Sequence, residues 1–300
     1  MNKIMNKIII TILCLLFLFS VYFFYLDEKI GDSDYEIIVF KNFLEDYKKY
    51  KNIENIEILN QWKNFFHLKT NCYFLNNNKN YFIWNDESVN RLNNIFRDKV
   101  HYFDGGNTYE KNIIKYYNVS VAVMSLFLRK DNIEDIIIYL TNKRDASNWE
   151  NKKDISYLYW RDREDRENIR KNLMKIIGID IPKLKGKNRQ KKEIFNEAVK
   201  IQENFKFSIA IEGYIKEEYI TEKIVNSFLS GSIPIYKGSP SINKYFNKNS
   251  FINIDDFENL EEAGEHIKKV KEDKKLAYKY LSEPPCTDEN IKNLLWWRYK

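Results

Sequence analysis

The chain has 300 residues, of which 44% are hydrophobic and 16% aromatic, so it is long enough to bury a large core and is not a disordered protein. Its 49 basic residues face 43 acidic ones, and the two kinds are mixed along the whole sequence. The net charge of +6 suits an anionic ligand or surface, but this mixing does not provide the concentrated basic patch of a nucleic-acid-binding protein.

The first feature along the chain is an uncharged segment of nineteen residues at 8–26, IIITILCLLFLFSVYFFYL. A helix of this length crosses about 30 Å of hydrocarbon. Lys3 and Lys7 precede it, which predicts a single-pass type II membrane protein with a cytoplasmic N-terminus, in the Golgi if the host is eukaryotic and in the inner membrane if it is bacterial. A cleaved signal peptide is the alternative, but the segment is longer than an ordinary signal-peptide core and lacks a small-x-small cleavage site.

After the anchor, short apolar runs alternate with charged, helix-like segments, which is typical of α/β layers. We expect residues 1–34 to form a cytoplasmic tip, anchor and stem, and two Rossmann-like domains over 35–150 and 151–300 to face a cleft. The polar segment 143–154 is the expected linker between them.

The predicted elements follow from those runs. Strands are predicted at YEIIVF (35–40), NCYFL (71–75), YFIW (81–84), VHYF (100–103), VSVAVMSLFL (119–128), DIIIYL (135–140), ISYLYW (155–160), FKFSIAI (205–211), SIPIYKG (232–238) and SFINI (250–254). Helices are predicted at REDRENIRKNLMKII (163–177), TEKIVNSFLSG (221–231) and NLEEAGEHIKKV (259–270).

Cysteine and histidine usage gives no sign of a disulfide scaffold or a metal site. Cys14 lies in the apolar segment, and Cys72 and Cys286 are far apart in sequence, so a single bridge between those two is the one alternative. The acidic pair Asp255 and Asp256 is interpreted as a solvated turn. We therefore expect neither a catalytic metal nor another cofactor.

A strand–helix–strand unit over residues 207–238 carries the candidate site. Thr221 is a natural N-cap and Gly231 a natural helix end, and a right-handed crossover brings Glu212, Tyr219 and the helix start to the carboxyl ends of the strands. A helix N-terminus with Lys223 suits a diphosphate, and Glu222 suits ribose hydroxyls. The alternative is that both are solvated charges of a first helical turn.

Residues 205–257 resemble the C-terminal signature of the α-1,3/4-fucosyltransferase family, glycosyltransferase family 10. The family pattern runs as a YKF-x-x-x-FEN strand, a Y-x-TEK helix start, a G-x-[IV]-P-[IV] strand, a G-[SA]-P turn and an N-x-x-SFI-x-x-x-DF segment, and all five elements occur here in order. Upstream, RENIRKNLMKIIGID from Arg166 resembles the family's R-x-x-[FY]-x-x-x-L-x-K helix, and KVHYFDGGNTYEKN resembles its K-x-x-[FY]-[YT]-G-E-N loop.

The resemblance implies a GT-B glycosyltransferase that moves L-fucose from GDP-β-L-fucose to a hydroxyl of an oligosaccharide, glycoprotein or glycolipid, with inversion and without a bound metal. In the family an arginine and the lysine of TEK contact the diphosphate and the glutamate of TEK holds the ribose. The implied donor-binding residues are Arg166, Glu212, Tyr219, Thr221, Glu222 and Lys223. Because RDREDRENIR offers four arginines, a shift of one turn would select Arg163 or Arg170 instead of Arg166.

Two departures from the family pattern matter. Gly213 replaces the asparagine of FEN, and Gly106 falls where the family's G-E-N loop has the carboxylate usually taken as the general base. Asp104 and Glu110 lie close by in sequence and are the candidate replacements, so the expected catalytic residues are Arg166, Lys223, Asp104 and Glu110; the alternative is an enzyme impaired by the missing base. Three functions remain open: a fucosyltransferase, a related transferase with another nucleotide sugar, and a non-catalytic glycan- or nucleotide-binding homologue.

Overall fold

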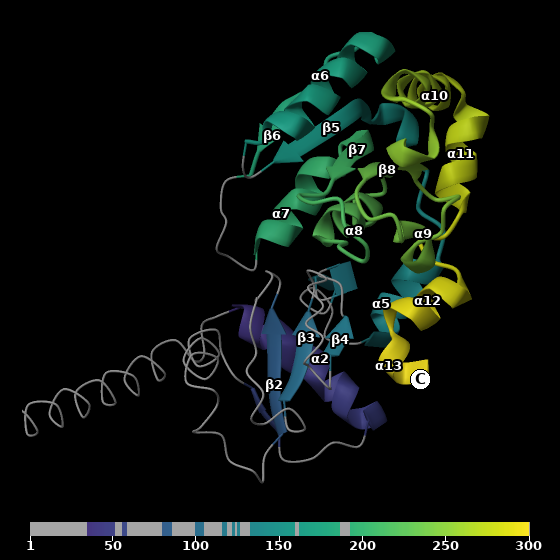
Figure 1. Cartoon of the computed structure of the whole chain (residues 1–300). Coiled ribbons are helices and arrows are strands. Elements are labelled where there is room, and N and C mark those ends of the chain that lie inside the picture. Colours follow the sequence, from purple (N-terminus) through teal and green to yellow (C-terminus); the bar gives the residue numbers. More distant parts are fainter. Residues whose placement is uncertain are drawn as a thin grey trace, which may run out of the picture.

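A computed structural model describes residues 35–51, 56–58, 80–85, 100–104, 116–118, 122–123, 125–126, 133–159, 162–186 and 193–299. Over these residues the chain is an α/β protein with two separate sheets, and every strand pair in both is parallel (Figure 1). No helix in these ranges is long and apolar enough to cross a membrane, and the predicted anchor at residues 8–26 lies outside them.

The first sheet consists of four strands that lie side by side in chain order. They are β1 (Ile56–Ile58), β2 (Asn80–Asn85), β3 (Val100–Asp104) and β4 (Tyr116–Asn118). Strands β2 and β3 confirm the predictions at YFIW and VHYF, while the predicted strand NCYFL lies outside the described residues.

The second sheet has the order β6-β5-β7-β8-β9. Its strands are β5 (Lys153–Tyr159), β6 (Lys183–Lys185), β7 (Phe205–Ile211), β8 (Ile233–Lys237) and β9 (Ile252–Asn253). The chain first builds outward from β5 to β6 and then returns to the other side of β5 with β7, as in doubly wound α/β proteins. The direction of winding therefore switches between β5 and β7.

Helices cover both faces of this sheet, which explains why β7 and β8 are almost continuously apolar. On one face α6 (Glu164–Ile177), α10 (Leu260–Glu272) and α11 (Lys274–Ser282) pack over Phe207, Ile209 and Ile235. On the other face α8 (Glu222–Leu229) packs over Ala210 and Tyr236, with α7 (Glu193–Gln202) beside it. The alternation of β7 side chains between the two faces follows the two-residue period of a strand.

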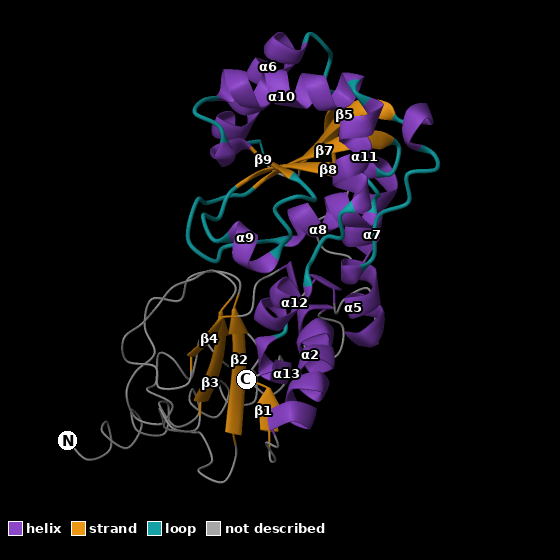
Figure 2. Cartoon of the chain, turned by 90° about the vertical axis from the view of Figure 1, so that its right-hand side faces the viewer, coloured by secondary structure: helices purple, strands orange, loops and turns teal. Residues whose placement is uncertain are grey.

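The last described helix, α13 (Trp296–Tyr299), lies against the first one, α2 (Tyr35–Lys51). Helix α12 (Asp288–Leu294) packs against the short α9 (Ile242–Tyr245). The next helix, α13, packs against α2 (Figure 2). The buried Trp297 ring meets Phe43 edge-on at 4.9 Å between centroids. Trp297 Nε1 donates to Asp46 at 2.7 Å, and Arg298 forms two hydrogen bonds with the same carboxylate.

Three predicted strands are wrong. YEIIVF opens helix α2, DIIIYL belongs to helix α5 (Ile133–Thr141), and the described residues of VSVAVMSLFL are helical. In α5 the buried side chains are Ile133, Ile136 and Leu140, a helical spacing, while Ile138 is exposed. The free energy gained by burying one apolar face of the helix thus outweighs the strand preference of β-branched residues. That preference is weak and depends on context.

The other predicted strands and helices of the C-terminal half are confirmed: ISYLYW in β5, FKFSIAI in β7, SIPIYKG in β8, SFINI in the short β9, and the three helices in α6, α8 and α10. The last part of SFINI continues as the short helix η3 (Ile254–Asp256). Cys286 is a buried free thiol whose Sγ lies 3.4 Å from the Tyr245 carbonyl oxygen, and Cys72 lies outside the described residues.

Candidate functional site

The candidate site lies at the carboxyl ends of β5 and β7, where the winding of the second sheet switches direction. In doubly wound sheets the two crossovers leave this point on opposite faces, which opens a crevice between them. The segment after β5 leads into α6 and supplies Arg163 and Arg166, and the segment after β7 supplies Glu212 and Gly213. Residues from separate parts of the sequence therefore meet at one edge of the sheet.

Glu212 is the centre of this site and is only 2% exposed. Its backbone N–H continues the ladder to β8 by donating to Lys237 at 2.8 Å. Its carboxylate accepts from the Thr221 backbone N–H at 2.8 Å and from the Thr221 hydroxyl at 2.6 Å, and Lys223 Nζ donates to it at 3.1 Å. This one carboxylate ties the end of β7 to the start of α8.

Thr221 stands at the N-cap of α8, as predicted, but its side chain does not cap the helix. Its hydroxyl donates to Glu212 and accepts from Lys223 Nζ at 2.6 Å. Because Thr221 is almost fully buried, its role in the structure is to orient Glu212 and Lys223.

Lys223 is held as a cation between two carboxylates. Burial alone lowers its pKa, but Glu212 and Glu222, at 3.1 and 3.5 Å, outweigh this and raise the pKa above its ordinary value. Burial likewise raises the pKa of Glu222, while Lys223 and hydrogen bonds at the helix start bring the net shift below the ordinary value. The side chain of Lys223 is 26% exposed, so a fixed positive charge reaches solvent here.

A glycine makes room for this arrangement. A Cβ at Gly238 would lie 2.5 Å from Glu212 Cγ and 2.5 Å from Tyr236 Oη, closer than real Cβ contacts. Tyr236 Oη accepts from the Ser239 backbone N–H at 3.0 Å and so holds the Gly-Ser-Pro turn. Burial, and then the Glu212 charge, raise the pKa of Tyr236, which remains a neutral phenol.

The loop between β7 and α8 is fastened to the same turn. Glu218 adopts a left-handed backbone with φ of 60°, and its N–H donates to Ser241 Oγ at 2.9 Å. Its carboxylate accepts from Lys244 Nζ at 2.7 Å. At the tip of this loop Tyr214 is 57% exposed, and its ring meets that of Tyr219 edge-on at 5.7 Å.

The structure decides which arginine of α6 faces the site. A Cβ placed on Gly213 would lie 3.0 Å from Arg166 Nη2, 3.7 Å from Tyr219 Oη and 3.8 Å from Arg163 Nη1. Arg170 instead forms a two-bond pair with Glu167 and donates to the Ile181 carbonyl. Arg166, Arg163 and Tyr219 therefore surround Gly213, and Arg170 is directed elsewhere.

Arg166 forms no ion pair with a described carboxylate. Its Nε is buried without a hydrogen-bond partner, and within the described part of the chain no carboxylate is in ion-pair distance of its guanidinium. A partly buried guanidinium in this state favours an anionic ligand, because desolvation of its charge is otherwise uncompensated.

The structure brings together six of the predicted site residues, namely Arg166, Glu212, Tyr219, Thr221, Glu222 and Lys223. Asp104 is the last residue of β3, at the carboxyl end of the first sheet, and its side chain lies outside the described residues. The same holds for the whole of Glu110 and Gly106. The parts of the site missed from sequence are Gly238, Tyr236 and Ser241, although the Gly-Ser-Pro turn was a visible signal for them.

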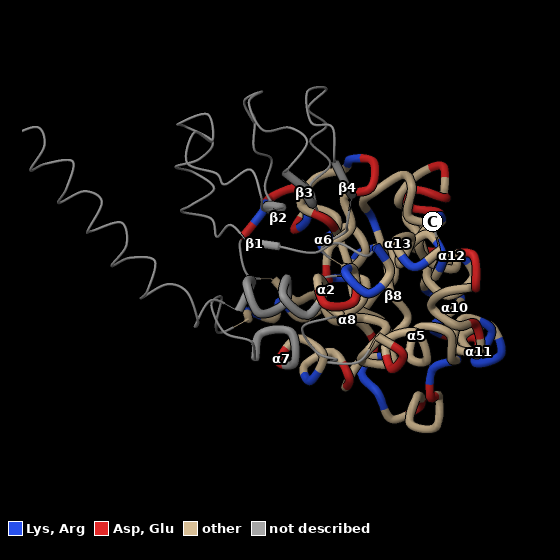
Figure 3. Tube along the Cα trace, turned by 90° about the horizontal axis from the view of Figure 1, so that it is seen from below, with Lys and Arg blue, Asp and Glu red and all other residues tan. Residues whose placement is uncertain are grey.

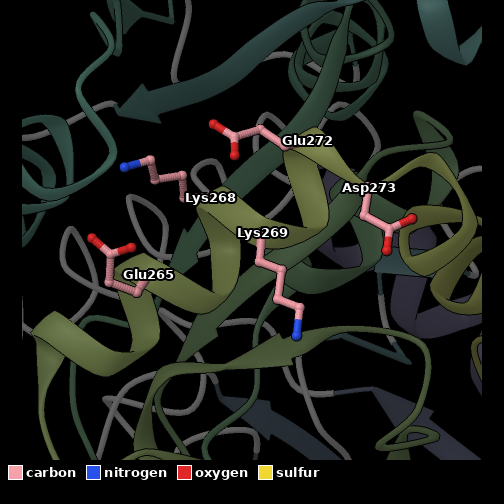
Figure 4. A pocket seen from close by; sticks show the side chains of 5 residues that line it. All are labelled: Glu265, Lys268, Lys269, Glu272 and Asp273. Carbon is pink, nitrogen blue, oxygen red and sulfur yellow. The ribbon is translucent and has the colours of Figure 1, made fainter.

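Two other features of the described surface do not form a comparable site. A hollow of about 400 Å³ beside α10 is lined by Glu265, Lys268, Lys269, Glu272 and Asp273, whose charged ends point in different directions (Figure 4). Acidic and basic residues are interspersed along the described chain (Figure 3). The described ranges contain no cluster of histidine, cysteine and carboxylate side chains suited to a metal, and Asp255 pairs with Lys237.

The second sheet is thus a doubly wound α/β sheet with cations at its switch point. Residues 149–283 match the model of the C-terminal domain of glycosyltransferase family 10 (fucosyltransferase), so the similarity to that family lies in the C-terminal half of the chain.

Individual relatives agree with the family match. The chain is 42% identical over 81 residues to the α-(1,3)-fucosyltransferase FucT of Helicobacter pylori, which is 27% of this chain and 17% of that protein. It is 39% identical over 80 residues to the mouse 4-galactosyl-N-acetylglucosaminide 3-α-L-fucosyltransferase 9, 26% of this chain and 22% of that protein. The matched stretch thus spans less than a quarter of either relative.

Solved structures extend the similarity of fold to most of the chain. One α1,3-fucosyltransferase structure matches with a TM-score of 0.58 and 18% identity over 90% of this chain and 85% of that one. A structure of an α1,3-fucosyltransferase with GDP-fucose matches with a TM-score of 0.52 over 83% and 78% of the two chains. At this identity the match concerns the fold.

Proposed function

We propose that this protein is a fucosyltransferase that transfers L-fucose from GDP-β-L-fucose to a hydroxyl of a glycan. The proposal rests on two cations that lie at the switch point of the part of the chain that matches family 10. One is Arg166, whose Nε has no hydrogen-bond partner, and the other is the protonated Lys223. Two cations fixed at the carboxyl ends of parallel strands suit the diphosphate of a nucleotide sugar. The relatives' names, which state fucosyl transfer, supply the sugar.

The chemical task is to stabilise negative charge on the departing GDP while the sugar becomes oxocarbenium-like. Arg166 and Lys223 offer fixed positive charge for this, and cations that need not reorganise are most effective where charge develops. Glu222, next to Lys223 at the helix start, is the proposed acceptor for ribose hydroxyls, and Tyr219 lines the same space near Gly213. With cations in place, the proposal requires no divalent metal.

The acceptor hydroxyl must also lose a proton. Gly106 supplies no carboxylate for this step, so Asp104 and Glu110 are the proposed bases, by their closeness in sequence and, for Asp104, its place at the carboxyl end of β3. A positioned general base contributes about 100- to 10,000-fold to such a reaction. Loss of transfer in Asp104→Asn or Glu110→Gln, with Gly106→Glu unchanged, would identify a relocated base; faster transfer in Gly106→Glu would identify a missing one.

The wider setting is part of the same proposal. We propose a GT-B arrangement in which the two parallel sheets belong to Rossmann-like domains facing a cleft, with inversion at the sugar carbon. Residues 8–26 are the proposed membrane anchor of a type II protein, on the charge pattern described above. A related transferase with another nucleotide sugar is the second candidate, because Gly213 and Gly106 both depart from the family pattern.

The test is incubation of the full chain with a panel of GDP-sugars and UDP-sugars, with and without oligosaccharide acceptors, while release of the nucleoside diphosphate is measured. Acceptor-dependent release of GDP from GDP-fucose alone is the expected result. Release from a different donor favours the second candidate, and binding of GDP without turnover identifies a non-catalytic homologue. Loss of transfer with a chelator, restored by manganese, would contradict the metal-free part.

A further inference from the structure

Arg163 is a second arginine beside Gly213, in addition to the proposed donor-binding Arg166. It precedes the first residue of α6, and its Nε and Nη2 donate to the two oxygens of Asp165 at 3.2 and 3.0 Å. This fork leaves Nη1, which lies 3.8 Å from the Cβ position of Gly213. Asp165 thus fixes the guanidinium plane while one N–H edge remains directed at the site.

Aromatic contacts hold the same guanidinium from another direction. The Arg163 Cζ lies 5.6 Å from the centre of the Tyr214 ring, within cation–π range. Tyr214 in turn contacts Tyr219 edge-on, and Tyr219 Oη is 3.7 Å from the Gly213 Cβ position. Arg163 is therefore positioned by two neighbours of opposite kinds, a carboxylate and a ring.

Atoms of both arginines lie within 4 Å of the position that a Cβ on Gly213 would take. With the asparagine of the family pattern at this position, the Cβ would stand 3.0 Å from Arg166 Nη2, 3.7 Å from Tyr219 Oη and 3.8 Å from Arg163 Nη1. Asp165 is an exposed carboxylate, so solvent weakens its neutralisation of Arg163.

We propose that Arg163 and Arg166 form a paired anion-binding site for the diphosphate of the donor, and that Gly213 is the residue that permits the pair. This inference rests on the proposed function, since it assigns a further contact to the same donor. A diphosphate offers oxygens on two phosphorus atoms, and arginines recognise such oxygens through fixed N–H edges. Lys223 then contacts the diphosphate from the α8 side.

The test is calorimetric titration of the full chain with GDP, GMP and guanosine. Arg163→Gln is expected to weaken GDP binding about tenfold, as for loss of one charge-assisted hydrogen bond, and to leave guanosine binding unchanged. Lys216→Gln is the matched control, because Lys216 is an exposed loop lysine that also lies over Tyr214, at 5.4 Å, and should not affect GDP.

Gly213→Asn supplies the second arm, with Gly213→Ala as the smaller change. Each is expected to weaken GDP binding, and the combination with Arg163→Gln is expected to weaken it less than the two separate effects together, because both act on one contact. Unchanged GDP affinity in Arg163→Gln overturns the inference, as does an equal loss for guanosine. An unaltered protein that binds no GDP contradicts the proposed function as well.

Discussion

At the scale of single residues, the site depends on Glu212. Its carboxylate is buried and forms an ion pair with Lys223. The pair with Lys223 is stabilising only because Thr221 satisfies the remaining lone pairs of Glu212 with two further donors. The sequence alone pointed to Glu212, Thr221 and Lys223, because the end of a strand and the start of a helix are marked by local sequence signals. It did not predict that Thr221 bonds Glu212 instead of capping α8, since that depends on how the two ends meet.

We expect Gly238→Ala to lower the free energy of unfolding by about 2 kcal/mol, in the range for overpacking a close contact. The new Cβ would force apart Glu212 and Tyr236, neither of which has free space to move. Chemical denaturation measures this, and Gly213→Ala is the control, because its tightest Cβ contact is with the flexible end of Arg166 and its other two are of ordinary length. Equal stability of Gly238→Ala and the parent would refute the close approach.

At the scale of helices and strands, the C-terminal sheet was predictable and the N-terminal half was less so. β7 and β8 are short apolar runs, and α8 between them has an N-cap residue and a glycine that ends it, with Gly231 at a φ of 67°. By contrast, α2 and α5 contain runs of isoleucine and aromatic residues that locally favour strands. Both helices contact α13, more than 150 residues further along the chain, which no local pattern reports.

The pair α10 and α11 contains a titratable contact, His266 Nε2 with Tyr280 Oη at 2.8 Å. Burial, and then Lys269, lower the pKa of His266 below 6.5 in the folded protein. The unfolded chain therefore binds a proton at higher pH than the folded one, and the stability due to the neutral ring falls as the pH drops below 6.5, levelling off below the folded pKa.

We accordingly expect His266→Gln to be less sensitive to acid than the parent. The measurement is the free energy of unfolding in urea at about pH 7.5 and about pH 5, where carboxylate effects are common to both proteins and cancel in the difference. A parent and variant that lose stability in parallel would show that His266 does not contribute.

At the scale of the whole molecule, residues of α13 join helices α2 and α5. Asp46 of α2 accepts two hydrogen bonds from Arg298 and one from Trp297, and Arg298 also reaches Glu134 of α5 at 2.7 Å. The Arg298 and Asp46 side chains are 7% and 9% exposed. Burial lowers the pKa of Arg298, but its two carboxylates outweigh this and raise it, so the cation persists at all ordinary pH values.

Arg298→Ala should therefore destabilise the protein by about 3 kcal/mol, since it leaves a buried Asp46 carboxylate without its cation. Lys292→Ala, which removes an exposed lysine from α12, is the matched control and should change stability by less than about 0.5 kcal/mol. Thermal or urea unfolding distinguishes the two. Similar small effects in both variants would mean that the C-terminal contact does not hold α2.

Lys223 is proposed to contact the departing nucleoside diphosphate. Turnover of GDP-fucose by the parent, Lys223→Ala and Lys216→Ala tests this contact most directly, with unfolding measured in parallel. Loss of one preorganised cation costs on the order of 100-fold or more in turnover, and we expect this for Lys223→Ala while Lys216→Ala stays near the parent. A folded Lys223→Ala protein that transfers fucose as fast as the parent would contradict the account.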